Sequence, residues 1–141
     1  SCKQQLARAR TIAAQQGLGD DPLLSARLAQ FEVELMALEY TALRLLSANQ
    51  QSKVPEVEAS ILKVRGTELR QGIFELLLDI AGPHAVPFSA EAQRLETIDE
   101  SIVPASLGSL AANCLDSRKL SIYGGANEVQ RNLIAKAWLA A

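Results

Sequence analysis

Two adjacent glycines, Gly124 and Gly125, stand directly before an expected helix start and are the feature of this sequence best suited to bind a ligand. Because glycine has no side chain, the backbone at such a pair can approach a ligand or another chain closely. The free N–H groups and the dipole at the start of the next helix favour anions and hydrogen-bond acceptors. On spacing alone a structural role also remains open, in which Gly124 caps one helix and Gly125 begins the next.

Two further places depart from what packing alone requires. The first is a pair of arginines, Arg8 and Arg10, on an expected helix near the start of the chain. The second is the loop from Ile80 to Phe88, which holds Gly82 and the only histidine, His84. We expect this histidine to be a structural or exposed loop residue rather than a catalytic one.

The elements that must position these residues are predicted to be helices. After Asp21 and Pro22, apolar residues recur at alternating steps of four and three, which predicts one long helix from near Pro22 to near Asn49. Asp21 is expected to accept a hydrogen bond from the first turn, and Pro22 fits there because its missing N–H costs nothing. The apolar seam of this helix consists of Leu24, Leu28, Phe31, Leu35, Leu38, Ala42 and Leu45.

A second long helix is predicted to begin at Val54-Pro55-Glu56 and to stop at Gly82-Pro83. In the middle of this helix, Gly66 suggests a close approach by a neighbouring helix. Its seam again alternates steps of four and three and consists of Leu62, Gly66, Leu69, Ile73, Leu76 and Ile80.

Four shorter segments complete the prediction: Cys2 to about Gln16, Ser89 to about Asp99, about Ala105 to Ile122, and a final helix from just after Gly125 to the C-terminus. The first has no convincing cap at its start and resembles the tail of a longer helix. Asn127 and Gln130 resemble a capping box, which would fix the start of the last helix. Together the segments predict an all-α fold, an antiparallel and mostly four-helix up-and-down bundle that forms a single domain over residues 1–141.

Composition and charge exclude several function classes. Leu and Ala supply 22 residues each of the 141, which favours helices over strands. The formal net charge of -2, with basic residues scattered along the chain, argues against nucleic-acid binding. Because Cys2 and Cys114 lie far apart and His84 has no second histidine beside it, neither a disulfide scaffold nor a metal site is expected. No apolar run reaches the ~20 residues that span a bilayer, and we expect a reducing, intracellular and cytoplasmic setting.

The stretch from Ile122 to Lys136, with the sequence IYGGANEVQRNLIAK, resembles the C-terminal signature of the flavin-dependent acyl-CoA dehydrogenase family. Ala59 to Lys63 is similar to a helix opening of the A-S-x-x-K type in that family, and Ile80 to Gly82 lies where the family has a glycine-containing loop. The resemblance covers nearly the whole chain as the family's C-terminal helical-bundle domain, with residues 90–109 matching least. It implies that the chain is a C-terminal fragment of a longer enzyme.

The resemblance also implies FAD as the cofactor. Arg10 corresponds to an arginine that contacts the pyrophosphate in the family, and a guanidinium suits that role because it forks onto phosphate oxygens. Gly82 is expected near the adenine end of an FAD bound to the partner subunit. For Asn127, a role as a helix cap alone remains open. The double glycine and the residues after it are expected against the cofactor: Gly124, Gly125, Ala126, Asn127 and Glu128.

The reaction of the family is α,β-desaturation of an acyl-CoA thioester, a step of fatty acid metabolism. A carboxylate removes the α-proton while a hydride leaves the β-carbon for the flavin. In one branch the base follows the tyrosine of the signature, where this chain has Gly124, so we assign no catalytic residue. Either the base lies on an earlier helix, upstream of Ser1, or the parent protein is a non-catalytic partner subunit or interaction domain of the same fold. No catalytic role is expected for Glu39, Glu58 or Glu68.

Activity and partners are therefore expected to belong to the full-length protein. Acyl-CoA would be its substrate, and subunits of the same family would be its partners in a homo-oligomer or a hetero-oligomer. We expect the isolated chain to fold but to lack dehydrogenase activity.

Overall fold

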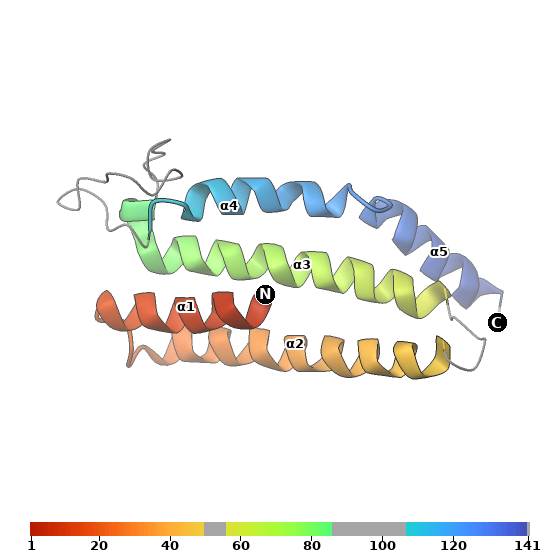
Figure 1. The fold of residues 1–141 in the computed structure, drawn as a ribbon, viewed down its shortest axis with the longest axis horizontal. Helices are drawn as coiled ribbons and strands as arrows, with labels where there is room; N and C mark the ends of the chain where they lie inside the picture. Colours follow the sequence, from red (N-terminus) through yellow and green to blue (C-terminus); the bar gives the residue numbers. More distant parts are fainter. Residues whose placement is uncertain (50–55, 86–106, 141) are drawn as a thin grey trace. The chain divides into compact units, whose positions relative to one another are not determined.

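The computed structural model describes residues 1–49, 56–85 and 107–140. Within these ranges the chain forms five α-helices and two short 3-10 helices, and no strand (Figure 1). The all-α prediction is therefore confirmed. The α-helices are α1 (Cys2–Gln15), α2 (Pro22–Asn49), α3 (Glu56–Ala81), α4 (Leu110–Ser117) and α5 (Asn127–Leu139), and the 3-10 helices are η1 (Gly82–Ala85) and η2 (Arg118–Ser121).

Two of the predicted helices are not described over their full length. The piece expected from Ser89 to Asp99 lies outside the described residues. The helix expected from about Ala105 to Ile122 is shorter where it is described, because α4 covers only Leu110–Ser117 and the chain tightens into η2 after it.

The chain folds into two compact units, and both long helices run through both of them. Unit 1 consists of Ser1–Leu28 and Gln71–Arg118, and unit 2 consists of Ala29–Arg70 and Lys119–Ala141. Unit 1 therefore contains α1, the start of α2, the second half of α3, and α4. Unit 2 contains the rest of α2, the first half of α3, and α5. The expectation of one domain over residues 1–141 stays a prediction.

Unit 1 holds most of the hydrophobic core. Its neighbouring helices run antiparallel, since Arg27 near the start of α2 pairs with Asp79 near the end of α3. Similarly, Gln71 of α3 donates a hydrogen bond to the backbone oxygen of Ser117 at the end of α4. Among the described residues of this unit, sixteen apolar side chains are buried: Leu6, Ala9, Ile12, Ala13, Leu24, Leu28, Ile73, Phe74, Leu76, Leu77, Ile80, Ala81, Ala85, Leu107, Leu110 and Cys114.

Unit 2 buries fewer apolar side chains and more polar ones in proportion to its size. Val64 and Leu69 of α3 are its buried apolar residues among those described, and Ser60 and Asn127 are buried beside them. A buried polar side chain needs a hydrogen-bond partner, because leaving it unpaired costs about 1–3 kcal/mol. Hydrogen bonds between polar side chains therefore hold the helices of unit 2 together to a larger extent than in unit 1.

The seam predicted for α2 is only partly buried. Leu24 and Leu28, which belong to unit 1, are buried as expected. The prediction is wrong for the remaining positions, which are half-buried: Phe31, Leu35, Leu38, Ala42 and Leu45. The reason is that unit 2, in its described residues, supplies fewer helical segments to cover this part of α2 than unit 1 supplies to its start.

The seam predicted for α3 is buried from Leu69 onward. Leu62 and Gly66 are half-buried, and a Cβ atom built on Gly66 would meet nothing within 4 Å. The close helix approach expected at Gly66 is therefore wrong. The seam residues that are buried are Leu69, Ile73, Leu76 and Ile80.

The start of α2 and the end of α3 follow the predicted caps, whereas the start of α1 differs. The Asp21 carboxylate accepts hydrogen bonds from the N–H groups of Leu23 and Leu24, at 2.8 and 3.0 Å, so the predicted start of α2 is confirmed. Gly82, at the end of α3, has a φ of +59°, which suits the expected helix stop. The first helix was expected to lack a convincing cap, yet Ser1 forms a capping box with Gln4.

Candidate functional site

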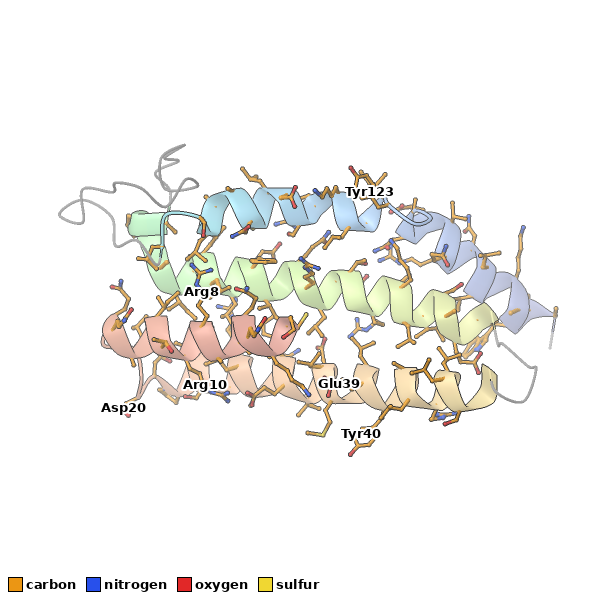
Figure 2. The ribbon with its side chains drawn as sticks, in the orientation of Figure 1. Arg8, Arg10, Asp20, Glu39, Tyr40 and Tyr123 are labelled. Atoms are coloured by element: carbon orange, nitrogen blue, oxygen red, sulfur yellow. The ribbon has the colours of Figure 1, made fainter. Side chains whose placement is uncertain are left out.

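Arg10 and Arg8 lie on α1 in different surroundings (Figure 2). Arg10 is exposed and lines a hollow of about 280 Å³. Arg8 is half-buried, and burial lowers the pKa of its guanidinium from the ordinary value. The hollow beside Arg10 is walled by the end of α1 and the start of α2: Ala13, Ala14, Leu18, Gly19, Leu24, Ser25 and Leu28. A guanidinium at the rim of an apolar hollow is suited to an anion that carries an apolar part.

Gly82 also belongs to unit 1, at the junction of α3 and η1. Its positive φ requires glycine, while a Cβ atom built on it would meet nothing within 4 Å. The backbone there is thus open to an approaching group. His84 lies two residues further on in η1, and its expected role as a loop residue stays a prediction.

The glycine turn, residues 121–126, runs from the last residue of η2 to the start of α5; it belongs to unit 2 and is largely exposed to solvent. Gly124 and Gly125 are exposed and have φ values of +63° and +92°, a region that residues with side chains rarely adopt. Tyr123, on the same turn, is also exposed (Figure 2). The Lys119 ammonium lies 5.8 Å from the centre of its ring. Because both glycines have positive φ values, the turn could not keep this backbone conformation without strain if they carried side chains.

No side chain caps the start of α5 in the described part of the chain. Ala126 is the N-cap residue, and its methyl group cannot accept a hydrogen bond. Asn127 is the first helical residue and is only 4% exposed, because its side chain turns inward. The capping box predicted from Asn127 and Gln130 is therefore wrong. The N–H groups of the first turn of α5 remain available to an acceptor outside the helix.

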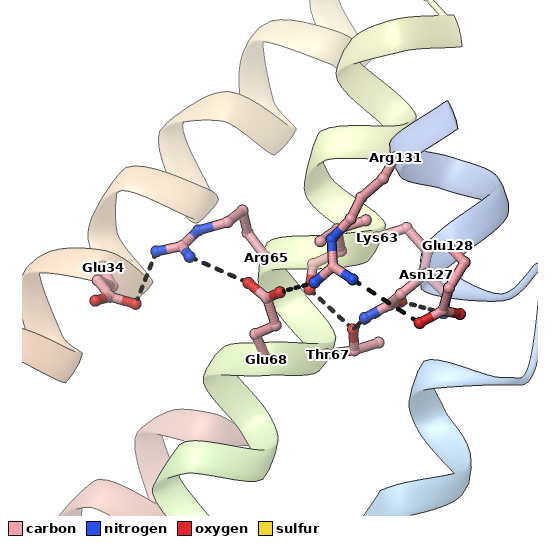
Figure 3. Close-up of polar contacts among 9 residues, drawn as sticks. Glu34, Lys63, Arg65, Thr67, Glu68, Asn127, Glu128 and Arg131 are labelled. Carbon is pink, nitrogen blue, oxygen red and sulfur yellow. Dashed lines mark hydrogen bonds and ion pairs between the residues drawn. The ribbon is translucent and has the colours of Figure 1, made fainter. Parts of the chain in front are cut away.

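The inward-facing carboxamide of Asn127 is held by α3 (Figure 3). Lys63 donates a hydrogen bond to Asn127 Oδ1 at 2.9 Å and a second one to the backbone oxygen of Leu120 at 2.8 Å. Asn127 Nδ2 donates to Thr67 Oγ1 at 3.0 Å, and that hydroxyl donates to the backbone oxygen of Val64 at 2.8 Å. The start of α5 is thus fixed to α3 by polar contacts.

A row of ion pairs continues from this cluster across unit 2 (Figure 3). Arg131 of α5 pairs with Glu68 of α3, and Arg131 also lies 3.9 Å from Glu128. Arg65 pairs with both Glu68, at 3.1 Å, and Glu34 of α2, at 3.3 Å. These groups are partly exposed, so each pair contributes only about 0–1 kcal/mol. They therefore add little to the contacts by which Lys63 and Thr67 hold Asn127.

Asn127 and Glu128 of this cluster are residues that the sequence predicts at the site, whereas their partners from α3 are not. In the sequence, nothing sets Glu68 or Thr67 apart from ordinary polar residues on a helix surface. A usable signal was present, because Ser60, Lys63 and Thr67 follow one another at steps of three and four. Polar residues at that spacing share one face of a helix, which here is the face that meets the start of α5.

The structure thus divides the residues predicted to bind the cofactor into two groups. Arg10 and Gly82 belong to unit 1, whereas Gly124, Gly125, Ala126, Asn127 and Glu128 form one continuous turn and helix start in unit 2. Their roles at a cofactor stay predictions.

The described ranges lack the features typical of a metal site or of a membrane span. These residues contain no group of three His, Cys, Asp or Glu side chains placed to hold a metal ion. Both cysteines are free. Among the helices described, none combines the length and the apolar character that crossing a bilayer would demand.

Comparison with known proteins gives two matches. A family model described as "Acyl-CoA dehydrogenase, C-terminal domain" matches residues 2–139 of the chain. The chain is also similar to "Acyl-CoA dehydrogenase IpdE1" of Mycolicibacterium smegmatis, with 28% identity over 129 residues. That alignment covers 89% of this chain and 27% of the relative. No solved structure matches the chain.

Proposed function

The chain belongs to the acyl-CoA dehydrogenase family, as its C-terminal domain, and from this premise we propose that it helps to bind FAD in a longer acyl-CoA dehydrogenase. The chain corresponds to 27% of the length of the relative described above, so the activity is a property of the longer protein. That activity would be the α,β-desaturation of an acyl-CoA thioester. The chain alone would carry no dehydrogenase activity.

The observation that carries this proposal is the exposed glycine turn followed by an uncapped helix. Gly124 leaves the backbone open, since a Cβ atom built on it would meet nothing within 4 Å, and the first N–H groups of α5 lack a side-chain acceptor in the described residues. Such donors suit phosphate or ribose oxygens, so the residues present fit a dinucleotide cofactor. When bound, FAD would supply the hydride acceptor of the reaction.

Arg10 would contribute a positive charge to the binding of the pyrophosphate. It is exposed, and it stands at the rim of the hollow between α1 and α2. Its planar guanidinium can donate two parallel hydrogen bonds to phosphate oxygens. Gly82, with its open backbone, would lie near the adenine end of an FAD bound to a partner subunit.

Gly124 supports a second candidate function, that of a non-catalytic partner subunit or interaction domain of the same fold. Glycine has no group that could remove the α-proton at this position. A Cβ atom built on Gly124 would meet nothing within 4 Å, although its φ of +63° disfavours residues with side chains. In the preferred account the base lies on an earlier helix, upstream of Ser1. In the alternative, the parent protein has no general base at all.

Subunit association is the third part of the proposal. One face of α2 in unit 2 carries four large apolar side chains that are each more than half exposed, and we refer to these as the α2 stripe: Val33, Met36, Tyr40 and Leu43. Their alternating steps of three and four give the spacing of a helix-pairing seam. A homo-oligomer or hetero-oligomer of same-family subunits would cover this stripe.

The reducing, cytoplasmic location expected from the sequence is also part of the proposal. It is compatible with the two cysteines, which are both free.

The test is the Gly125→Val substitution in the full-length protein. At a φ of +92° valine is strained, and its Cβ would lie 2.5 Å from Gln130 Nε2. The turn should therefore change its conformation, and we expect FAD affinity to fall by about tenfold or more, the factor that 1.4 kcal/mol represents. Fluorescence titration of the apoprotein with FAD measures this affinity.

The matched control is Gly66→Ala, which adds a methyl group to a helical glycine with open space around it. This variant should keep the affinity of the wild-type protein and be more stable by about 0.5–1 kcal/mol. If Gly125→Val bound FAD as tightly as the control, the glycine turn would not belong to the cofactor site.

A further inference from the structure

Lys63 contacts both ends of the glycine turn. Its Nζ atom lies 2.8 Å from the backbone oxygen of Leu120, in η2, and 2.9 Å from Oδ1 of Asn127, at the start of α5 (Figure 3). Leu120 and Asn127 enclose the six residues that form the turn, 121–126. One ammonium group therefore bridges the two points at which the chain enters and leaves the turn.

The surroundings make this bridge difficult to replace. Asn127 is 4% exposed, and Lys63 is half-buried on the face of α3 that meets it. Without the ammonium, the Leu120 oxygen loses its donor from α3, and Oδ1 of Asn127 keeps only the Thr67 hydroxyl within reach, at 3.2 Å. That hydroxyl already donates to Val64, so it cannot serve both acceptors at once. Water would then have to enter, or the turn would have to move.

Charge also favours a cation at this point. The carbonyl groups at the end of a helix carry a partial negative charge, and Leu120 lies in the last turn of η2. The start of α5 carries the opposite partial charge, and the Asn127 carboxamide oxygen stands between it and the ammonium. The end of η2 therefore favours the ammonium, and the bond to the Asn127 oxygen offsets the unfavourable approach of a cation to the start of α5.

We propose that Lys63 is a positioning residue that holds the glycine turn in the conformation required for flavin binding. The flavin part of this inference rests on the proposed function, whereas the effect on the turn does not. Lys63 acts through Leu120 and Asn127 and need not contact the cofactor. Thr67 assists by holding the carboxamide of Asn127 from its other side.

The experiment compares Lys63→Met with the wild type in the full-length protein, by amide hydrogen exchange and by FAD titration. The amides of Ile122 and Tyr123 report on the turn, because both donate to the Lys119 oxygen, at 2.9 and 3.0 Å. We expect their exchange to become faster by about tenfold or more, and FAD affinity to fall by about tenfold, because Lys63→Met removes two charge-assisted hydrogen bonds. Exchange in α1 should not change.

Two further variants separate positioning from a general loss of stability. Arg65→Met removes a cation two residues away on the same helix, but one that pairs with Glu34 and Glu68 rather than with the turn. It should leave both readouts unchanged. Lys63→Arg keeps a cation with several donors, and it should return exchange and affinity to near their wild-type values.

The results of these measurements either support or overturn the role of Lys63. Unchanged exchange at Ile122 and Tyr123 in Lys63→Met would overturn the inference, and so would faster exchange with full FAD affinity. If the wild-type protein bound no FAD, the proposed function would fail, and the exchange data alone would decide whether Lys63 holds the turn. Should Lys63→Met not fold, Lys63→Gln provides the same comparison, because it removes the positive charge that reaches both Leu120 and Asn127 but keeps a polar end to the side chain.

Discussion

At the scale of single residues, two arginines two positions apart on α1 differ in what they can bind. Arg8 is half-buried, and desolvation lowers the pKa of its guanidinium. Arg10 is exposed beside a hollow of about 280 Å³. Only the second can turn its guanidinium toward a phosphate without leaving a buried position.

A charge reversal at Arg10 is expected to weaken the retention of FAD by the full-length protein. In Arg10→Glu a carboxylate would repel the pyrophosphate that the guanidinium is proposed to bind. The ratio of flavin to protein after gel filtration measures retention. Lys3→Glu, which makes the same change of charge at an exposed position of α1, should retain FAD as the wild type does. Equal retention by the two variants would remove Arg10 from the site.

Asn127 illustrates what the sequence could and could not predict about the site. The glycines, the following helix start and the position of Asn127 were all visible in the motif. Its spacing to Gln130 suggested a capping box, whereas the carboxamide bonds to Lys63 and Thr67 instead. Local spacing cannot reveal such contacts, because their partners lie 64 and 60 positions away in the sequence.

At the scale of helices, ends were more predictable than burial. The start of α2 followed from Asp21 and Pro22, and the end of α3 from Gly82, because caps are set by adjacent residues. Burial along α2 was not predictable in the same way. A regularly spaced apolar seam is buried only where other helices cover it. The start of α2, in unit 1, is well covered, whereas the rest of α2, in unit 2, is covered less fully.

Two leucines of equal size test this difference in burial. Leu76 of α3 is fully buried in unit 1, so Leu76→Ala should lower the free energy of unfolding by about 2–5 kcal/mol. Leu35 of α2 is only partly buried, and Leu35→Ala should cost measurably less, since the loss scales with the apolar area that was buried. Urea unfolding of the chain provides both values. Equal losses would contradict the burial pattern described for unit 2.

At the scale of the whole molecule, the apolar surface indicates where the chain needs a partner. The α2 stripe leaves Val33, Met36, Tyr40 and Leu43 between 57% and 66% exposed. Side chains of this size rarely form a regular exposed row on a monomer. Only the helical spacing of the stripe could be read from the sequence. Its exposure depends on how unit 2 folds.

Two lysines placed on the α2 stripe should therefore weaken subunit association. In the double variant Tyr40→Lys, Leu43→Lys, two charges would have to be buried at the interface, which is unfavourable without partners. Sedimentation velocity of the full-length protein measures the assembly state. Gln30→Lys is the control, because Gln30 lies on α2 outside the stripe and a lysine there can pair with Glu34. An unchanged assembly in the double variant would show that the stripe is not a subunit interface.

The central claim is that this chain is part of a flavin site, and the visible absorption spectrum of the full-length protein tests it most directly. The protein should be purified without added cofactor and then titrated with FAD. We expect the absorption bands of bound flavin, either at once or after addition of FAD. A folded, colourless protein that takes up no FAD would contradict the account and favour the non-catalytic partner subunit, with Gly124 at the position of the missing base.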